Sequence, residues 1–261
     1  MLTGSVGVTV SRNNAGGAVA QAKEWAVALR GEYIERPHNL SVPELLAQRN
    51  LAALVVVESG GPRVHCREGS FAYHPSMAGL RVQNLQRGGQ DHLVSALGLH
   101  PGMRVLDCTL GLGSDAAVAS YAVGAAGCVV GLEASPLLHF AVSWGLAHYE
   151  TKDAELNAAL RRIQTVNITA EAYLRACAAD SFDAVYFDPM FRHPVTGSKN
   201  MEALRPLAWE RPLEKAVVEL ALRAAPVVVI KERNATILQS YGCREFVGGK
   251  YSRVVYGVVR R

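Results

Sequence analysis

The segment Arg104–Asp115 constrains the fold of this chain more than any other stretch. The short apolar run near its start predicts a buried strand that ends at Asp107. The chain then passes through Gly111 and Gly113 and enters an alanine-rich stretch, residues 115–126, that predicts a helix. A strand, a glycine turn and a helix N-terminus in this order form a crevice of nucleotide size. Glycine lets the backbone approach a ligand closely because no Cβ stands in the way.

Strands and helices alternate along the chain after this segment. Further strands are predicted at residues 128–132, 163–167, 182–187 and 227–231, with helical patterns between them. Such alternation predicts a mostly parallel sheet with helices on both faces. A glycine pair between residues 244–247 and 251–259 predicts a closing antiparallel hairpin at the sheet edge. The predicted fold class is therefore α/β, with a Rossmann-like sheet and an antiparallel C-terminal hairpin.

The chain length permits one large domain and one small one. We predict a small N-terminal α/β domain over residues 1–70, a helical connector over 71–100 and the main domain over 101–261. With neither a membrane-length apolar run nor a secretion signal, we expect a cytoplasmic protein with no membrane partner. The net charge of +4 permits a polyanionic partner without requiring one. Five scattered cysteines without a C-x-x-C pair predict reduced thiols and no metal site.

Two classes of cofactor fit the glycine turn. Gly111, Gly113 and Ala116 satisfy the loose dinucleotide pattern, and Glu133 lies where a ribose-binding acid would follow. These features alone are compatible with a nicotinamide cofactor. The two glycines by themselves are also compatible with a tight turn that binds no ligand. Asp107 favours S-adenosylmethionine instead, because a carboxylate suits the ammonium of its amino-acid part and repels a pyrophosphate. The closing hairpin is also typical of the class I methyltransferase sheet and not of a dehydrogenase.

A second motif follows the predicted fourth strand. The segment Phe187–Phe191 resembles the (Asp/Asn)-Pro-Pro-aromatic signature of methyltransferases that act on exocyclic or amide nitrogens, with Met190 in place of the second proline. The Asp188 carboxylate and the Pro189 carbonyl would accept hydrogen bonds from the amine and stabilise charge that appears on its nitrogen. The Phe191 ring would stack on the base. A buried strand end followed by a proline turn is the structural alternative.

Together these motifs resemble one known family, the bacterial ribosomal RNA small subunit methyltransferase J group, which methylates guanine N2 in 16S RNA. The resemblance covers roughly residues 70 to 260, and the segment His74–Ala78 is closer to the Gram-positive branch. It rests on Asp107-x-Thr109-x-Gly111-x-Gly113-x-Asp115, on Asp188–Phe191 and on Ser252-Arg253. It implies cofactor contacts at Ser114, Asp115, Glu133, Ala134, Thr169, Ala170 and Asp188. Better-known members carry an arginine where this chain has Ser114.

Basic residues after the second motif are candidates for substrate binding. Arg192, His193 and Lys199 would contact RNA phosphates, although ordinary solvated charge explains them equally well. Arg81 would either cover the methionine end of the cofactor or simply pack. Lys231 would either line the substrate mouth or join a surface ion cluster.

We therefore predict an S-adenosylmethionine-dependent methyltransferase that modifies an exocyclic amine of a nucleic-acid base. On the resemblance, the expected partner is 16S ribosomal RNA or the small ribosomal subunit. Two alternatives remain at this point: a nicotinamide-dependent oxidoreductase, and a catalytically silent RNA-binding protein on a methyltransferase fold.

Overall fold

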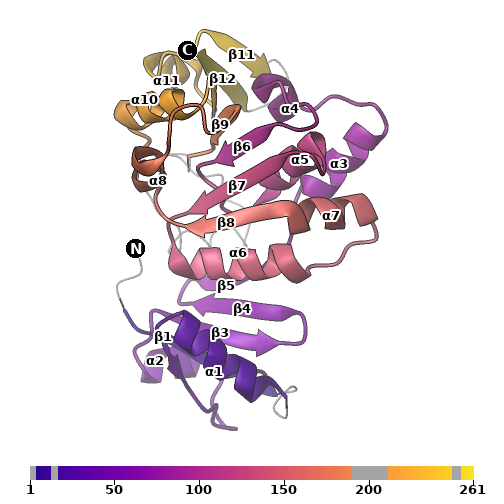
Figure 1. The fold of residues 1–261 in the computed structure, drawn as a ribbon. Helices are drawn as coiled ribbons and strands as arrows, with labels where there is room; N and C mark the ends of the chain where they lie inside the picture. The colour runs from indigo at the N-terminus through magenta and orange to yellow at the C-terminus, as the bar shows by residue number, and fades with distance from the viewer. Residues whose placement is uncertain (1–3, 13–16, 190–210, 249–253) are drawn as a thin grey trace. The chain divides into compact units, whose positions relative to one another are not determined.

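The computed structural model describes residues 4–12, 17–189, 211–248 and 254–261. These residues form two compact units (Figure 1). The first unit holds the described residues up to His74 together with Ser135–His148. The second holds Pro75–Ala134 and the remaining described residues from Tyr149 to the C-terminus. None of the helices in these stretches is both long and apolar enough to cross a membrane.

The first unit is a small α/β structure built on a five-stranded sheet of order β2-β1-β3-β4-β5. Its strands are β1 (Val6–Val10), β2 (Glu32–Tyr33), β3 (Ala53–Glu58), β4 (Gly61–Cys66) and β5 (Gly69–Ala72). β1 runs parallel to β2 and β3, whereas β3, β4 and β5 form an antiparallel meander. Its helices are α1 (Ala18–Ala28), α2 (Val42–Gln48) and α6 (Pro136–His148).

Local sequence signals explain two features of this unit. Helix α2 begins with a capping box, in which Ser41 and Glu44 satisfy each other's backbone N–H groups. Helix α6 follows β7 in the chain but packs against β4, where Gly61 leaves room for the Trp144 ring. A Cβ at Gly61 would lie 2.0 Å from that ring. The close approach therefore requires glycine at this position.

The second unit is built on a seven-stranded sheet of order β11-β12-β10-β9-β6-β7-β8. Its strands are β6 (Arg104–Asp107), β7 (Cys128–Glu133), β8 (Ile163–Asn167), β9 (Ala184–Phe187), β10 (Val227–Glu232), β11 (Glu245–Gly248) and β12 (Val255–Arg260). The strands from β10 to β8 are parallel, and β12 joins β10 antiparallel with β11 outside it. The predicted fold class, a mostly parallel α/β sheet with an antiparallel C-terminal hairpin, is confirmed.

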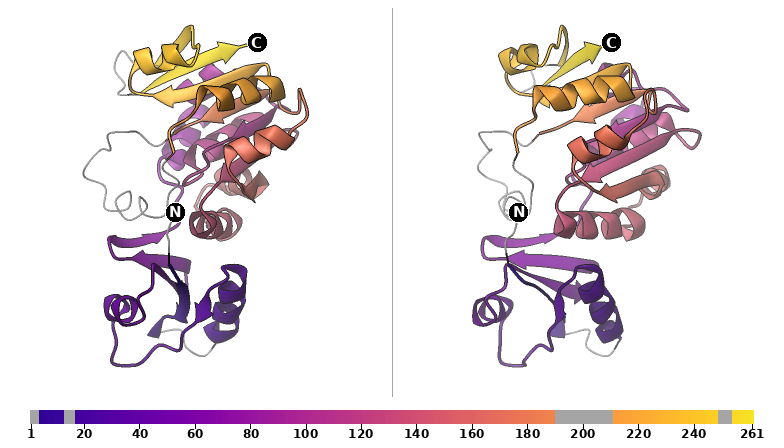
Figure 2. Two further views of the ribbon diagram at one scale, coloured as in Figure 1. Left: turned by 90° about the vertical axis from the view of Figure 1, so that its left-hand side faces the viewer. Right: turned by 60° about the vertical axis from the view of Figure 1, so that its left-hand side comes forward.

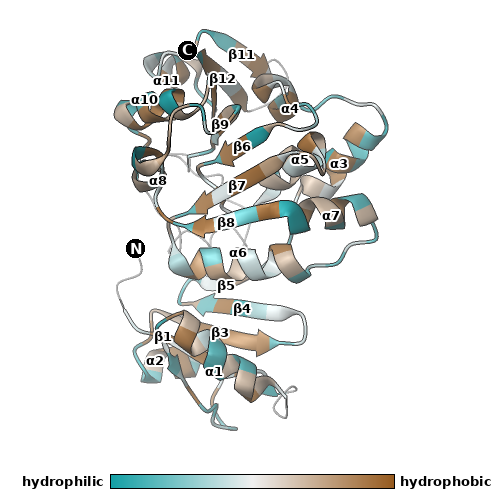
Figure 3. Cartoon of the chain, viewed as in Figure 1, coloured by the Kyte–Doolittle hydropathy of each residue, from teal (hydrophilic) through white to brown (hydrophobic). Residues whose placement is uncertain are grey.

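Helices cover both faces of this sheet (Figure 2). They are α3 (Ala78–Gln86), α4 (His92–Leu97), α5 (Ser114–Val123), α7 (Ala154–Arg162), α8 (Ala170–Ala176), α10 (Lys215–Ala224) and α11 (Ala235–Ser240). Leu106, Val185 and Val228 are buried with α8 and α10 on one face. Because side chains alternate along a strand, Tyr186 points to the other face, where α4 and α5 pack. Buried on both sides, the inner strands are strongly hydrophobic (Figure 3).

The strand order reverses at β6. The chain runs outward through β7 and β8 on one side of β6, and through β9 and β10 on the other. In open α/β sheets, ligands bind beyond the carboxyl ends of the strands at such a switch point. The fold therefore directs attention to the residues that follow β6, β9 and β10.

Candidate active site

The register of the parallel strands brings three polar residues together at this edge. Asp107 on β6 and Val229 on β10 both lie level with Tyr186 on β9. Two residues further along, the chain reaches Thr109, Asp188 and Lys231 in the three neighbouring segments. Residues at matching positions of parallel strands project to the same face. The clustering of these side chains is thus a direct result of sheet register.

The glycine turn has the backbone shape that its sequence predicts. Gly111 and Gly113 have φ values of +49° and +70°, in the left-handed region that favours glycine. A Cβ at Gly111 would meet only the Thr109 carbonyl, at 3.7 Å, so the space beside the turn is open. Helix α5 begins directly afterwards at Ser114. Backbone N–H groups and an accessible turn are therefore presented at a helix N-terminus.

A single hydroxyl ties this turn to the second motif. Thr109 Oγ1 accepts a hydrogen bond of 2.6 Å from the backbone N–H of Asp188. Thr109 is itself held by Asp107, whose Oδ1 accepts from the Thr109 N–H at 2.9 Å. Asp107 is almost fully buried, whereas the Asp188 side chain is partly accessible. The glycine turn and the Asp188-Pro189 loop thus lie side by side in one unit.

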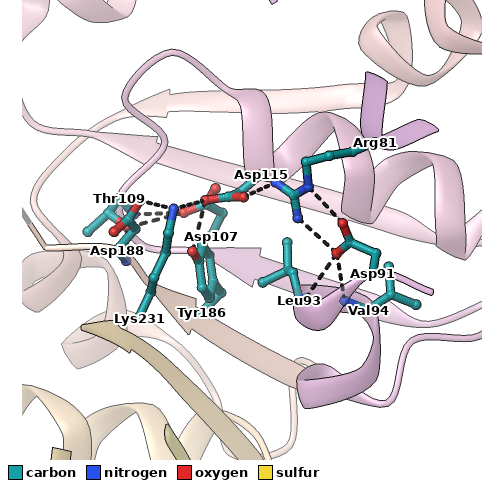
Figure 4. A network of polar contacts seen from close by, with 10 residues as sticks. All are labelled: Arg81, Asp91, Leu93, Val94, Asp107, Thr109, Asp115, Tyr186, Asp188 and Lys231. Carbon is teal, nitrogen blue, oxygen red and sulfur yellow. Dashed lines mark hydrogen bonds and ion pairs between the residues drawn. The ribbon is translucent and has the colours of Figure 1, made fainter. Parts of the chain in front are cut away.

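A network of buried charges lies next to these loops (Figure 4). Asp115, in the first turn of α5, bonds to the Arg81 guanidinium through Oδ1. Its Oδ2 accepts from the Tyr186 hydroxyl at 2.8 Å and from Lys231 Nζ at 3.0 Å. Lys231 Nζ also donates to Asp188 Oδ2 at 2.7 Å. Both Asp115 oxygens therefore have partners within the protein.

The outer end of the network fixes two helices. Arg81 on α3 makes two hydrogen bonds to Asp91, of 2.7 and 2.8 Å. Asp91 Oδ1 also accepts from the N–H groups of Leu93 and Val94, and so caps α4. The salt bridge between Arg81 and Asp91 thus joins the start of α4 to the site.

Burial and charge divide the acids of the site into two kinds. Burial raises the pKa of Asp107 to about 7, helped by the neighbouring Asp115 and Asp188 carboxylates and opposed by the Thr109 N–H. Burial also raises the pKa of Asp188, to about 6, although Lys231 opposes it. For Asp115 the nearby Lys231 and Arg81 outweigh burial and lower the pKa.

The site therefore holds more carboxylates than cations. Asp91, Asp107, Asp115 and Asp188 face only Arg81 and Lys231 as cationic partners within the network drawn in Figure 4. A positively charged ligand reduces this excess, whereas a pyrophosphate adds to it. The residues present consequently fit S-adenosylmethionine, which carries a sulfonium and an ammonium, better than a dinucleotide.

The remaining predicted cofactor residues lie at the ends of β7 and β8. Glu133 ends β7, and its Oε2 accepts from the Gly111 N–H at 3.2 Å, so the predicted ribose-binding acid adjoins the glycine turn. Ala134 follows it and is half-buried. Thr169 caps α8 by accepting from the Ala172 N–H, and Ala170 is the first residue of that helix. The cofactor contacts of these residues stay predictions.

Four predicted site residues, Phe191, Arg192, His193 and Lys199, lie outside the described part of the chain, as do Met190 and Ser252-Arg253 of the motifs. Among the residues that are described, no group of three or more His, Cys, Asp or Glu side chains is placed to hold a metal ion. Asp91 was not singled out from the sequence. Lys231 is mostly buried within the network, so the surface ion cluster considered for it is wrong.

The fold and site define a class I methyltransferase, and comparison with known proteins agrees. The family described as "Putative SAM-dependent methyltransferase" matches residues 71–256, more than half of the chain. The chain belongs to this family, and its cofactor is S-adenosylmethionine. Family membership decides against the nicotinamide alternative.

Individual relatives extend the comparison over most of the chain. The Bacillus subtilis (strain 168) protein YpiP is 37% identical over 227 residues, which covers 86% of this chain and 88% of that protein. Ribosomal RNA small subunit methyltransferase J of Pseudomonas fluorescens (strain Pf0-1) is 29% identical over 248 residues, with 90% and 88% covered. A solved SAM-dependent methyltransferase from Neisseria gonorrhoeae shares the fold at 15% identity, with a TM-score of 0.58 and 97% and 95% covered.

Proposed function

We propose that this methyltransferase modifies an exocyclic amino group of a nucleic-acid base, with guanine N2 of 16S ribosomal RNA as the first target. The observation that carries the proposal is the position of Asp188-Pro189 at the end of β9, hydrogen-bonded through Thr109 to the glycine turn. Relatives named ribosomal RNA small subunit methyltransferase J support RNA as the substrate class.

An exocyclic amine needs activation because its lone pair is conjugated with the ring. In the proposed reaction, the Asp188 carboxylate and the Pro189 carbonyl accept its N–H hydrogens and stabilise positive charge as it develops on nitrogen. Bound S-adenosylmethionine would supply a methyl group on a positively charged sulfur. The amine nitrogen would take the methyl group, the sulfur would keep the bonding electron pair, and the nitrogen would lose its proton to solvent. No general base is required.

The proposed site can act only on a base that is not stacked within a duplex. Asp188 follows a buried strand and its side chain is only partly accessible, so an amine inside a duplex cannot reach it. We therefore expect a single-stranded or flipped-out nucleotide. In this proposal Arg192, His193 and Lys199, which follow the motif in the sequence, contact phosphates and position the RNA.

The test is transfer of labelled methyl to RNA that lacks the modification. Small ribosomal subunits and naked 16S RNA from a deletion strain are incubated with the protein and labelled cofactor, and the nucleosides are separated by mass spectrometry. We expect N2-methylguanosine, with RNA from the undeleted strain as an unreactive control. A different methylated nucleoside would revise the target. Absence of transfer to either substrate, with cofactor binding intact, would favour the silent RNA-binding alternative.

A further inference from the structure

Lys231 occupies a central position between two acids of different character. It lies near the end of β10, and its side chain is 18% exposed. Its Nζ lies 2.7 Å from Asp188 Oδ2 and 3.0 Å from Asp115 Oδ2 (Figure 4). One ammonium thus bridges the loop that carries the proposed acceptor and the helix that follows the glycine turn.

The Asp115 side of this bridge is anchored. Asp115 belongs to the first turn of α5, where the helix N-terminus favours a negative charge. It is held by Arg81 from α3 and by the Tyr186 hydroxyl from β9. With one acid held in this way, Lys231 cannot swing freely, and its second bond fixes the place of Asp188 Oδ2.

The Asp188 side of the bridge has an electrostatic consequence. Burial and the neighbouring Asp115 both favour the neutral form of Asp188, and Lys231 opposes them. Among the described residues, Asp107 on β6, Asp115 on α5, Tyr186 on β9 and Glu232 on β10 interact electrostatically with Asp188. Arg81 on α3, Asp91 at the start of α4 and Tyr256 on β12 lie further along the network and interact with Asp115, with Lys231 or with one another. Among these groups Arg81 is the other cation, and its hydrogen bonds go to Asp91 and Asp115.

We infer that Lys231 is a positioning residue for methyl transfer, which holds Asp188 ionised and oriented through Oδ2 so that Oδ1 accepts the target amine. The inference rests on the proposed function for the identity of the amine. A protonated Asp188 has one acceptor oxygen fewer and carries no charge to stabilise the nitrogen. Lys231 itself touches neither cofactor nor substrate in this role.

The experiment compares four variants. Lys231→Met keeps the length of the side chain and removes its charge, Lys231→Gln keeps a donor without charge, and Lys231→Arg keeps the charge. Lys215→Met changes an exposed lysine at the start of α10 and is the matched control. Circular dichroism establishes that each variant is folded. If Lys231→Met does not fold, Lys231→Gln takes its place.

The first measurement is the pKa of Asp188, which can be determined whether or not the protein transfers methyl groups. The carboxyl carbon of Asp188 is titrated by NMR in protein labelled at aspartate, with Asp188→Asn to assign the signal. We expect the pKa of Asp188 to lie more than one unit higher in Lys231→Met and Lys231→Gln, and to stay near its original value in Lys231→Arg and Lys215→Met. An unchanged pKa in Lys231→Met and Lys231→Gln would overturn the inference.

The second readout is the pH profile of methyl transfer. In Lys231→Met the acid limb of kcat moves to higher pH, so kcat at pH 5 falls about tenfold or more while KM for the cofactor changes less than threefold. Lys231→Arg restores the limb. A fall in kcat with an unmoved limb would mean a merely structural role and overturn the inference. If the unaltered protein methylates no RNA, the proposed function fails, and the NMR titration still decides whether Lys231 controls Asp188.

Discussion

The two ends of strands β6 and β9 carry charged residues in opposite settings. At the amino ends, Arg104 and Asp183 pair at 3.1 Å, with side chains 50% and 38% exposed. At the carboxyl ends, Asp107 is buried and Asp188 shares Lys231 with Asp115. Water screens the first pair, which adds little to stability. At the second end burial costs desolvation free energy, which the cationic partners outweigh at Asp115 but which prevails at Asp107 and Asp188.

This contrast shows that the protein keeps buried charges at the carboxyl ends of β6 and β9 despite the free energy needed to desolvate them. A buried network with more acids than cations is a poor way to stabilise a fold, because apolar side chains of similar volume would do as well or better. Perturbed pKa values at the open edge of an α/β sheet are instead typical of functional sites. The exposed pair at the amino ends adds little to stability, and the buried charges at the carboxyl ends have the character of a ligand site.

The largest expected effect is a loss of activity that occurs when the carboxyl end of β9 is changed and not when its amino end is changed. Asp188→Ala removes the proposed acceptor and is expected to lower methyl transfer by about 10³, the upper range for loss of one preorganised stabilising group. Cofactor binding, measured by calorimetry, should remain within several-fold. Asp183→Ala, at the other end of β9, is the control and should leave transfer unchanged. Unchanged turnover in Asp188→Ala would remove its assigned role.

A second comparison concerns the free energy of unfolding and contrasts the buried network at the carboxyl ends with the exposed pair at the amino ends. Arg81→Met leaves Asp91 and Asp115 without their shared guanidinium and should lower the free energy of unfolding by about 3 kcal/mol. Arg104→Met breaks the exposed pair and an exposed hydrogen bond to the Asp180 carbonyl, and should shift the midpoint of thermal unfolding by no more than a few degrees. Urea and thermal denaturation measure both. Equal effects would mean that burial does not distinguish the two ends.

The pH dependence of stability provides a third comparison. Since the pKa of Asp107 is raised in the folded state, to about 7, that state binds more protons than the unfolded chain between about pH 4 and pH 7. Stability from this group is therefore lost as pH rises, by about 2 kcal/mol between about pH 5.5 and pH 8. Asp107→Asn should lack this loss, so denaturation curves of the two proteins should diverge with pH. Parallel curves would contradict the raised pKa.

The smallest expected effect concerns the ligand. A cation bound near Asp107 and Asp188 favours their ionised forms, so S-adenosylmethionine binding near pH 6.5 should release about half a proton to one proton, and almost none near pH 8.5. Calorimetry in buffers of different ionisation enthalpy counts these protons. S-adenosylhomocysteine, which lacks the sulfonium charge, should release fewer. Equal release by both ligands would place the sulfonium away from these acids.

Much of the fold followed from local patterns in the sequence. The strand before Asp107, the glycine turn and the alternating elements after it appear close to their predicted places, because each carries a strong apolar period or a turn signal. The two-residue β2 and the short β5 carry no such signal and were not predicted. Both depend on pairing with a neighbouring strand, which no local pattern encodes.

From the residues alone, the site was most predictable where it follows a strand directly. Asp107 and Asp188 stood out because they end or follow apolar runs. Arg81 and Asp91 lie on or before helices far from these motifs in sequence, and only packing of α3 and α4 against α5 brings them close. Lys231 lies near the end of a strand, yet two roles fitted it equally, since burial is a property of the folded unit. The cofactor and substrate contacts of individual residues remain predictions.

The hydrogen bond from the Asp188 N–H to Thr109 Oγ1 links the backbone of the proposed acceptor loop to the segment that leads into the glycine turn. A ligand that orders the glycine turn would also restrict the backbone of Asp188 through this hydrogen bond, and this coupling requires no domain movement. The methyl donor would in this way help to prepare the group that receives its target.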